Sequence, residues 1–171
     1  MYSVARSAMS AIEDELQADG EALLRRREAV ERSIARDFRG SRVAVLVQAA
    51  QVEREREKLR AELQRMVREV DDAGPSDDDA YDDEDGAAAG FYAARERLVA
   101  RDRELVGRGE ALRRRAAELR KGPAPAKLVE LERELEQLES HLRQWRGRCR
   151  KAGLMLDLPR WGEFAGSAAD D

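Results

Sequence analysis

The chain has 171 residues, of which 40% are charged and 5% are aromatic, and its formal net charge is −4 at pH 7. An average globular domain has about 25% charged residues, so the composition argues against an enzyme fold with a thick aromatic core. No stretch approaches the roughly 18 consecutive apolar residues of a membrane-spanning helix. Apolar residues in helical registers instead predict an all-α, elongated coiled-coil or helical-hairpin protein with a disordered acidic linker.

The charge is unevenly distributed along the chain. Residues 71–87 hold nine acidic and no basic side chains, whereas residues 88–152 hold 17 basic and 10 acidic ones. The first 20 residues have no uninterrupted apolar core and include three consecutive acidic residues at 13–15, which is unlike a secretory or mitochondrial leader. With a single cysteine, the expectation is an intracellular protein of the cytoplasm or nucleus.

Residues 1–70 are predicted to form a long N-terminal helical arm with a kink near Gly40, where a short loop or a stutter is the alternative. Before the kink, apolar residues recur at helical spacing and share one stripe: Ile12, Leu16, Leu23, Val30 and Ile34. Gly20 is a weak point in this helix. After the kink, a second seam follows with heptad spacing: Phe38, Val45, Val52, Leu59, Leu63 and Met66.

The apolar run at residues 43–47 is open to two interpretations. Its β-branched residues would suit a strand, but no partner strand is visible and a helical Glu/Arg-rich sequence follows directly. The favoured interpretation is a helix that is buried on more than one side, where several helices meet.

Residues 71–90 are predicted to be an acidic disordered linker, since they offer almost nothing to bury and Gly74-Pro75 ends the preceding helix. The second helix is expected at 91–121, where five apolar residues lie seven apart: Phe91, Leu98, Leu105, Leu112 and Leu119. Two glycines, at 107 and 109, weaken its middle, so this helix needs a partner.

A Pro/Gly turn at 122–125 precedes the most specific signal in the chain, a heptad coiled-coil helix at 126–152. Its seam advances in steps of three and four: Leu128, Leu131, Leu135, Leu138, Leu142, Trp145 and Cys149. Glutamates come early and arginines late, an order that suits the helix dipole. The later helices are expected to fold back antiparallel on residues 42–70.

Residues 153–171 are predicted to form an apolar docking segment followed by an acidic tail. The apolar side chains are Leu154, Met155, Leu156, Leu158, Trp161 and Phe164. Such a dense cluster would either fold back on the helices or dock on another protein.

Catalysis is not expected, and neither is a cofactor or a metal ion. No Gly-rich phosphate loop or nucleophile with its base is present, and one His141 with one Cys149 cannot supply a zinc site. His141 is expected at the surface. Cys149 is interpreted as a small buried hydrophobe, with a reactive thiol as the alternative because neighbouring arginines could lower its pKa.

A basic cluster near the end of the heptad helix could contact a polyanion or an anionic membrane: Arg143, Arg146, Arg148, Arg150 and Lys151. Because the basic runs of the chain lie among glutamates that can pair with them at i,i+4, direct binding of nucleic acid is not favoured.

Residues Pro125–Leu135 have the sequence PAKLVELEREL. This stretch resembles the segment of BAR-type membrane-bending proteins in which a Pro/Lys break leads into a Leu/Glu-rich helix. It covers 11 of the 171 residues. The resemblance implies three long helices, an antiparallel homodimer and a membrane-surface function. The glycines of the second helix and the short third helix depart from that pattern.

The expected function is that of a non-enzymatic structural or adaptor subunit in a multi-protein coiled-coil assembly. The Leu seams and the C-terminal apolar segment would bind other helical proteins, in a hetero-oligomer rather than a homodimer. No small-molecule substrate is expected. The alternatives are a BAR-like membrane-surface module acting as a homodimer, and a nucleic-acid-associated helical protein that uses its Arg clusters.

Overall fold

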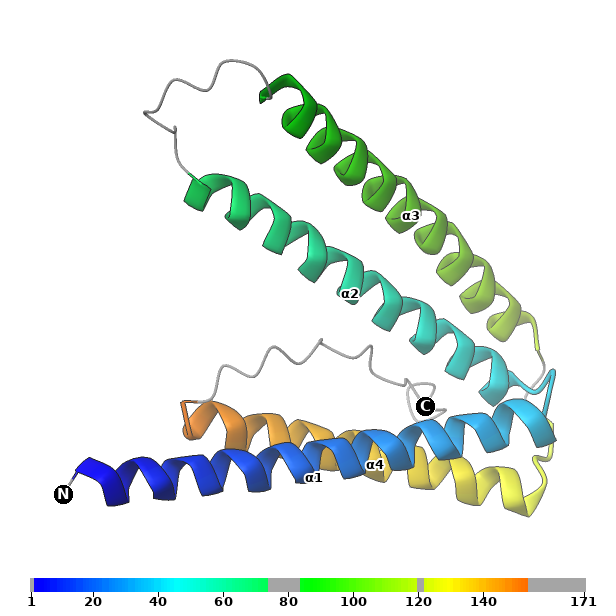
Figure 1. Cartoon of the computed structure of the whole chain (residues 1–171). Helices are drawn as coiled ribbons and strands as arrows, with labels where there is room; N and C mark the ends of the chain where they lie inside the picture. The colour runs from blue at the N-terminus through cyan, green and yellow to red at the C-terminus, as the bar shows by residue number, and fades with distance from the viewer. Residues whose placement is uncertain (1, 74–83, 120–121, 154–171) are drawn as a thin grey trace. The chain divides into compact units, whose positions relative to one another are not determined.

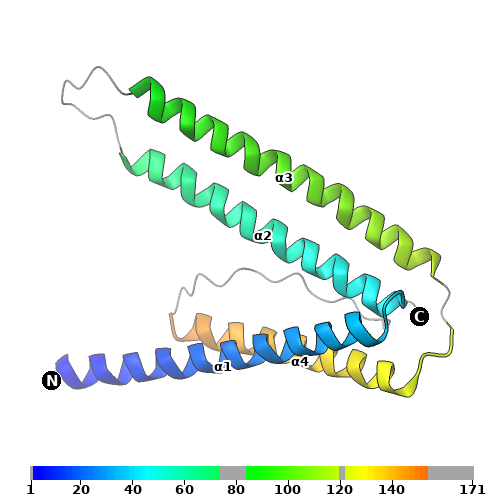
Figure 2. The ribbon, with the colours of Figure 1, turned by 45° about the vertical axis from the view of Figure 1, so that its right-hand side comes forward.

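The computed structural model describes residues 2–73, 84–119 and 122–153, and within them it contains four helices and no strand. The helices are α1 (Tyr2–Asp37), α2 (Arg42–Ala73), α3 (Glu84–Glu118) and α4 (Ala126–Lys151), shown in Figures 1 and 2. The predicted all-α class is confirmed. The described chain has one helix more than the three that the BAR-type resemblance implies.

The helices belong to two units. Unit 1 contains residues 2–47, 115–119 and 122–153 of the described chain, and therefore α1, α4, the first turns of α2 and the end of α3. Unit 2 contains residues 48–73 and 84–114, which are the remainder of α2 and of α3. Each unit is considered by itself.

In unit 1, α1 and α4 lie side by side and antiparallel (Figures 1 and 2). Lys127 at the start of α4 lies 3.5 Å from the Asp37 carboxylate at the end of α1, and Arg148 lies 3.0 Å from Asp19. Of the later helices expected to fold back on residues 42–70, α3 does pair with α2. The heptad helix α4 instead packs mainly along α1 and meets only the start of α2. The physical reason is that α1 is long and carries an aliphatic stripe of matching 3/4 spacing.

The chain turns between α1 and α2 instead of continuing through a kink. The Ser41 amide donates to the Phe38 carbonyl (3.0 Å), and Gly40 has φ +88°, a left-handed conformation that suits glycine. The Ser41 hydroxyl accepts from the Ala44 amide (3.1 Å) and so caps α2. The single long arm expected for residues 1–70 is therefore two helices.

The apolar run at 43–47 is helical and contributes to the core of unit 1. Val43, Ala44 and Val47 are buried in one cluster with two residues of α1 and three of α4: Val30, Ile34, Leu128, Leu135 and Leu138. Three helices meet at this cluster, which explains why the start of α2 is apolar on more than one side.

Unit 2 is an antiparallel pairing of α2 with α3. Arg56 of α2 bonds Asp102 of α3, whereas Glu53, earlier in α2, pairs with Arg113, later in α3. Helix α3 begins at Glu84 and not at Phe91, because the alanines at 87–89 have the highest helix propensity of any residue. The expected linker at 71–90 is therefore largely helical at its two ends. The expectation of disorder for residues 74–83 lies outside the described residues.

Candidate functional site

The heptad seam of α4 is filled by α1. Its members Leu135, Leu142 and Trp145 are almost fully buried, and Leu131 packs partly buried against the same core. From α1, the facing side chains are Leu16, Leu23, Leu24, Val30 and Ile34. The structure therefore places these seam residues in contacts within the chain, and the partner-binding role expected for them stays a prediction.

Trp145 anchors one end of this interface. Its indole Nε1 donates a hydrogen bond to the Leu16 carbonyl of α1 (2.6 Å), and the side chain is 2% exposed. The ring lies against Gly20, where an added Cβ would come within 2.6 Å of Cε2 and 2.8 Å of Cη2. Gly20, expected to weaken the helix, is therefore required for the close approach of the indole.

A buried ionic cluster lies in the same interface. The Arg27 side chain is 1% exposed, its Nη1 lies 2.8 Å from Oε1 of Glu139 in α4, and its Nε lies 3.6 Å from Oε1 of Glu31. Arg27 was not among the core residues predicted from the sequence. The signal that could have found it is its position between Leu23 and Val30, four residues after one seam residue and three before the next.

Ion pairs join α2 and α3 in unit 2. Arg56 Nε lies 3.0 Å from the Asp102 carboxylate, and Arg56 Nη1 lies 3.1 Å from Glu53. Burial lowers the pKa of Arg56, but the Asp102 hydrogen bond and the Glu53 charge outweigh it, so the net pKa is raised. Beside this network, Gly109 of α3 faces Val52 of α2: an added Cβ at position 109 would lie 3.5 Å from Cγ1 of Val52, an ordinary van der Waals distance.

The predicted seam of α2 changes from buried to exposed along its length. Phe38 is half-buried against the core of unit 1, and Val45 and Val52 are both buried, at 3% exposure. Three later members are only half-buried: Leu59, Leu63 and Met66. The seam residues are apolar throughout, so the rise in their exposed fraction reflects how much of the seam other helices cover and not a change of residue type.

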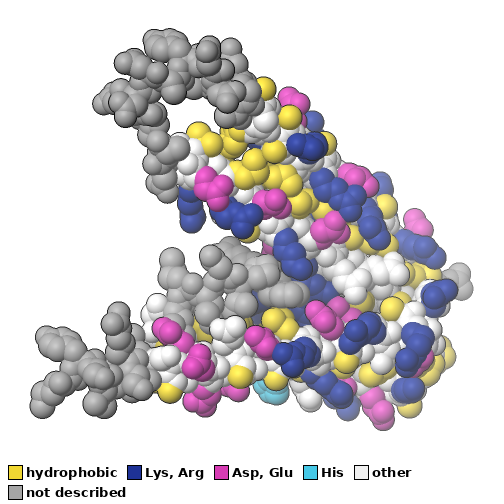
Figure 3. All heavy atoms as spheres, viewed as in Figure 1, with side chains coloured by type: hydrophobic (Ala, Val, Ile, Leu, Met, Phe, Trp, Pro, Cys, Tyr) yellow, Lys and Arg dark blue, Asp and Glu magenta, His cyan; other side chains and the backbone are white. Residues whose placement is uncertain are grey.

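Apolar side chains stay exposed where α2 ends and α3 begins. Val67 is 46% exposed, Val70 is 51% exposed and Tyr92 is 61% exposed. Tyr92 meets Phe91 edge to face, with ring centroids 5.6 Å apart. Together with the half-buried Leu63 and Met66, these residues are called the tip patch below. Figure 3 shows hydrophobic side chains gathered over this end of α2 and α3.

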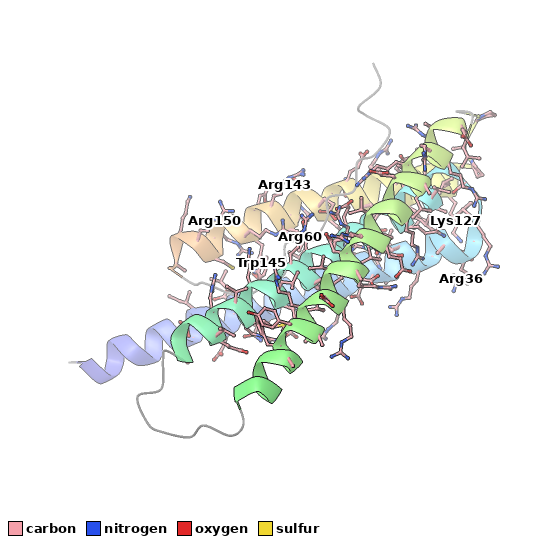
Figure 4. The ribbon with its side chains drawn as sticks, turned by 90° about the horizontal axis from the view of Figure 1, so that it is seen from above. Arg36, Arg60, Lys127, Arg143, Trp145 and Arg150 are labelled. Carbon is pink, nitrogen blue, oxygen red and sulfur yellow. The ribbon has the colours of Figure 1, made fainter. Side chains whose placement is uncertain are left out.

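The basic cluster follows the outer side of α4. Arg143 and Arg150 are seven residues apart and project from the side opposite Trp145 (Figure 4). Arg148 pairs with Asp19, Lys151 is exposed and Arg146 is half-buried. Part of the cluster is thus used to hold α4 on α1.

The two residues considered for chemistry have ordinary structural environments. Cys149 is buried in the α1–α4 core, and burial raises the pKa of its thiol despite the opposing charge of Arg148. Both features favour a small buried hydrophobe over the alternative of a reactive thiol. His141 is exposed. The described residues contain no group of three side chains that could hold a metal ion.

Two further expectations concern the C-terminal apolar segment and a membrane-spanning helix. The docking segment, with Leu154, Leu156, Leu158, Trp161 and Phe164, lies outside the described residues. No helix of the described chain combines the length and the apolar character needed to cross a bilayer.

Comparison with known proteins gives no family for this chain. No protein-family model matches it, and no curated protein and no solved structure is significantly similar to it.

Proposed function

We propose that this chain is a non-enzymatic scaffold or adaptor protein that binds other helical proteins through the tip patch of unit 2. The observation that carries the proposal is the exposure of this patch. The same seam is 3% exposed at Val52 and 51% exposed at Val70. A contiguous apolar surface flanked by charged side chains is typical of a protein-interaction site.

The side chains of the patch are suited to such a role. Aromatic residues dominate the energetics of protein interfaces, and the patch holds Phe91 and Tyr92 side by side. If a partner covers the exposed part of Tyr92, roughly 100 Å² leaves water, which corresponds to about 2–3 kcal/mol. On α2, residues 63, 66, 67 and 70 recur at helical spacing and so form one stripe for a partner helix.

The proposal moves the partner-binding surface from α4 to unit 2. The α4 seam holds unit 1 together, and the predicted hetero-oligomer would form at the open seam instead. A partner helix is favoured because the exposed apolar residues of α2 recur at helical spacing, which suits the apolar face of another helix.

A triple serine variant tests the proposal: Val67→Ser, Val70→Ser and Tyr92→Ser in the full chain. The matched control replaces three exposed small or polar residues of the same helices, as Ala61→Ser, Gln64→Ser and Ala93→Ser. Light scattering gives the solution mass, circular dichroism the helix content, and affinity capture the co-purifying helical proteins. The proposal predicts that only the first variant loses its partners while its helix content is kept. Equal capture by both variants would refute it.

A further inference from the structure

We infer that residues 154–164, called the C-terminal apolar segment below, dock on the first turns of α1 in the same chain. The sequence left two destinations for this segment, the helices of its own chain or another protein. The place where α4 ends on α1 favours the first. This inference concerns unit 1 and does not depend on the tip patch.

The apolar stripe of α1 continues past the part that α4 covers. Leu16 is 7% exposed and lies in one cluster with Trp145, whereas Ile12, four residues earlier on the same stripe, is 50% exposed. In the sequence the stripe runs on toward the N-terminus in steps of three and four: Ile12, Met9, Ala5 and Tyr2. Because α1 is helical from Tyr2 onward, these positions share one face of the helix.

Helix α4 ends too early to cover this face. Arg148 of α4 lies 3.0 Å from Asp19 of α1. Continuing this antiparallel register to Lys151, the last residue of α4, reaches about residue 16 of α1. Figures 1 and 2 show the first turns of α1 extending past the end of α4. Residues 2–12 therefore lie beyond α4 and span roughly 16 Å at 1.5 Å per residue.

The chain leaves α4 next to these turns. The Gly153 amide donates to the Arg150 carbonyl (3.1 Å), and Gly153 has φ +70°, the left-handed conformation with which helices commonly end. The C-terminal apolar segment begins with the next residue. Its eleven residues reach roughly 35 Å when extended, about twice the length of the turns of α1 that lie beyond α4.

Both the composition and the tether favour this segment over other occupants. The segment holds six large apolar side chains: Leu154, Met155, Leu156, Leu158, Trp161 and Phe164. Covering them and the α1 stripe with one another removes both from water. A segment joined through a short connection has an effective concentration in the millimolar range, so a second copy or another protein at micromolar concentration competes at a disadvantage of about a thousandfold.

Cysteine pairs in the full chain test whether the segment reaches the stripe, in a Cys149→Ala background. One pair is Glu13→Cys with Asp157→Cys, because Glu13 borders the stripe three residues from Leu16. The control pair is Asp14→Cys with Asp157→Cys, since Asp14 is two residues from both Ile12 and Leu16 and so faces away. Both positions on α1 are exposed and acidic. Under mild oxidation the first pair should form a disulfide several-fold faster than the control, and within one chain.

Hydrogen exchange measured by mass spectrometry tests whether the contact covers α1. In the full chain, Leu154→Ser, Leu156→Ser and Leu158→Ser together should speed the exchange of the backbone amides at 5–13 several-fold, because these turns then open more often. Amides at 16–34, which α4 covers, should keep their protection. The matched control places three serines after the segment, as Ala165→Ser, Ala168→Ser and Ala169→Ser, and should change neither region.

Four results would overturn the inference. Equal rates for the two cysteine pairs would reduce the contact to chance encounters. A disulfide mainly between two chains would make a second copy the occupant. Unchanged exchange at 5–13 in the variant with serines in the segment would show that the segment does not cover these turns. Free exchange at 5–13 already in the natural chain would leave the stripe open for another protein.

Discussion

Replacing Gly20 by alanine should destabilise the protein, although alanine is normally the better helix residue. In an exposed helix interior the same change stabilises by about 1 kcal/mol, because glycine has the lower helix propensity. At position 20, however, the new methyl group would lie 2.6–2.8 Å from carbon atoms of the Trp145 indole. The indole is 2% exposed and its Nε1 donates a hydrogen bond to the Leu16 carbonyl. A shift of the ring would therefore break this hydrogen bond or disturb the packing around it.

The magnitude follows from three opposing effects. Overpacking a well-packed core costs about 1–3 kcal/mol. A displaced indole leaves a buried donor without its acceptor, which costs about 1–3 kcal/mol more. Subtracting the propensity gain of about 1 kcal/mol leaves a net loss of roughly 1–5 kcal/mol in the free energy of unfolding.

Gly147→Ala is the matched control, because Gly147 lies on α4, in the same unit, and an added Cβ there meets nothing within 4 Å. It should stabilise by up to about 1 kcal/mol. Urea unfolding followed by circular dichroism measures both variants. Gly20→Ala should cost less in a Trp145→Leu background than in the natural chain, since the smaller side chain leaves room for the methyl group. If Gly20→Ala stabilises the protein as much as Gly147→Ala does, the packing argument is refuted.

Two further predictions concern buried groups of the α1–α4 interface. Arg27→Ala should lower the free energy of unfolding by about 3–5 kcal/mol, because it leaves the Glu139 carboxylate buried without that cation. Arg26→Ala is the control and should cost under about 1 kcal/mol, since Arg26 is exposed. Similar losses for the two variants in urea unfolding would contradict this prediction. Burial raises the pKa of Cys149, so its thiol should react slowly with a disulfide reagent until urea unfolds the chain. The contribution of this thiol to the free energy of unfolding is fully present below the pKa that the thiol has in the unfolded chain, and it is lost as pH rises through the higher pKa of the folded chain. If the free energies of unfolding of the natural chain and of Cys149→Ala differ by the same amount at every pH, the raised pKa is contradicted.

The sequence by itself determined the all-helical class and much of the core of unit 1. The 3/4 spacing that includes Leu135, Leu142 and Trp145 identified the side chains that are buried on α4. The apolar run at 43–47 was correctly interpreted as a helix contacted from more than one side. These features depend on helical periodicity, which is a local property of the chain and can be counted along the sequence.

Only the tertiary structure decided which helix pairs with which. Both α1 and α2 carry apolar stripes that could receive α4, and the choice depends on contacts between residues more than 100 positions apart, such as Arg27 with Glu139. The roles of Gly20 and Arg27 follow from that choice, because a glycine or an arginine has no fixed role until its neighbour across the interface is known. The exposure of the tip patch could not be predicted from the sequence for the same reason. Residue spacing identifies a seam, but only the packing of the helices shows how much of that seam is covered.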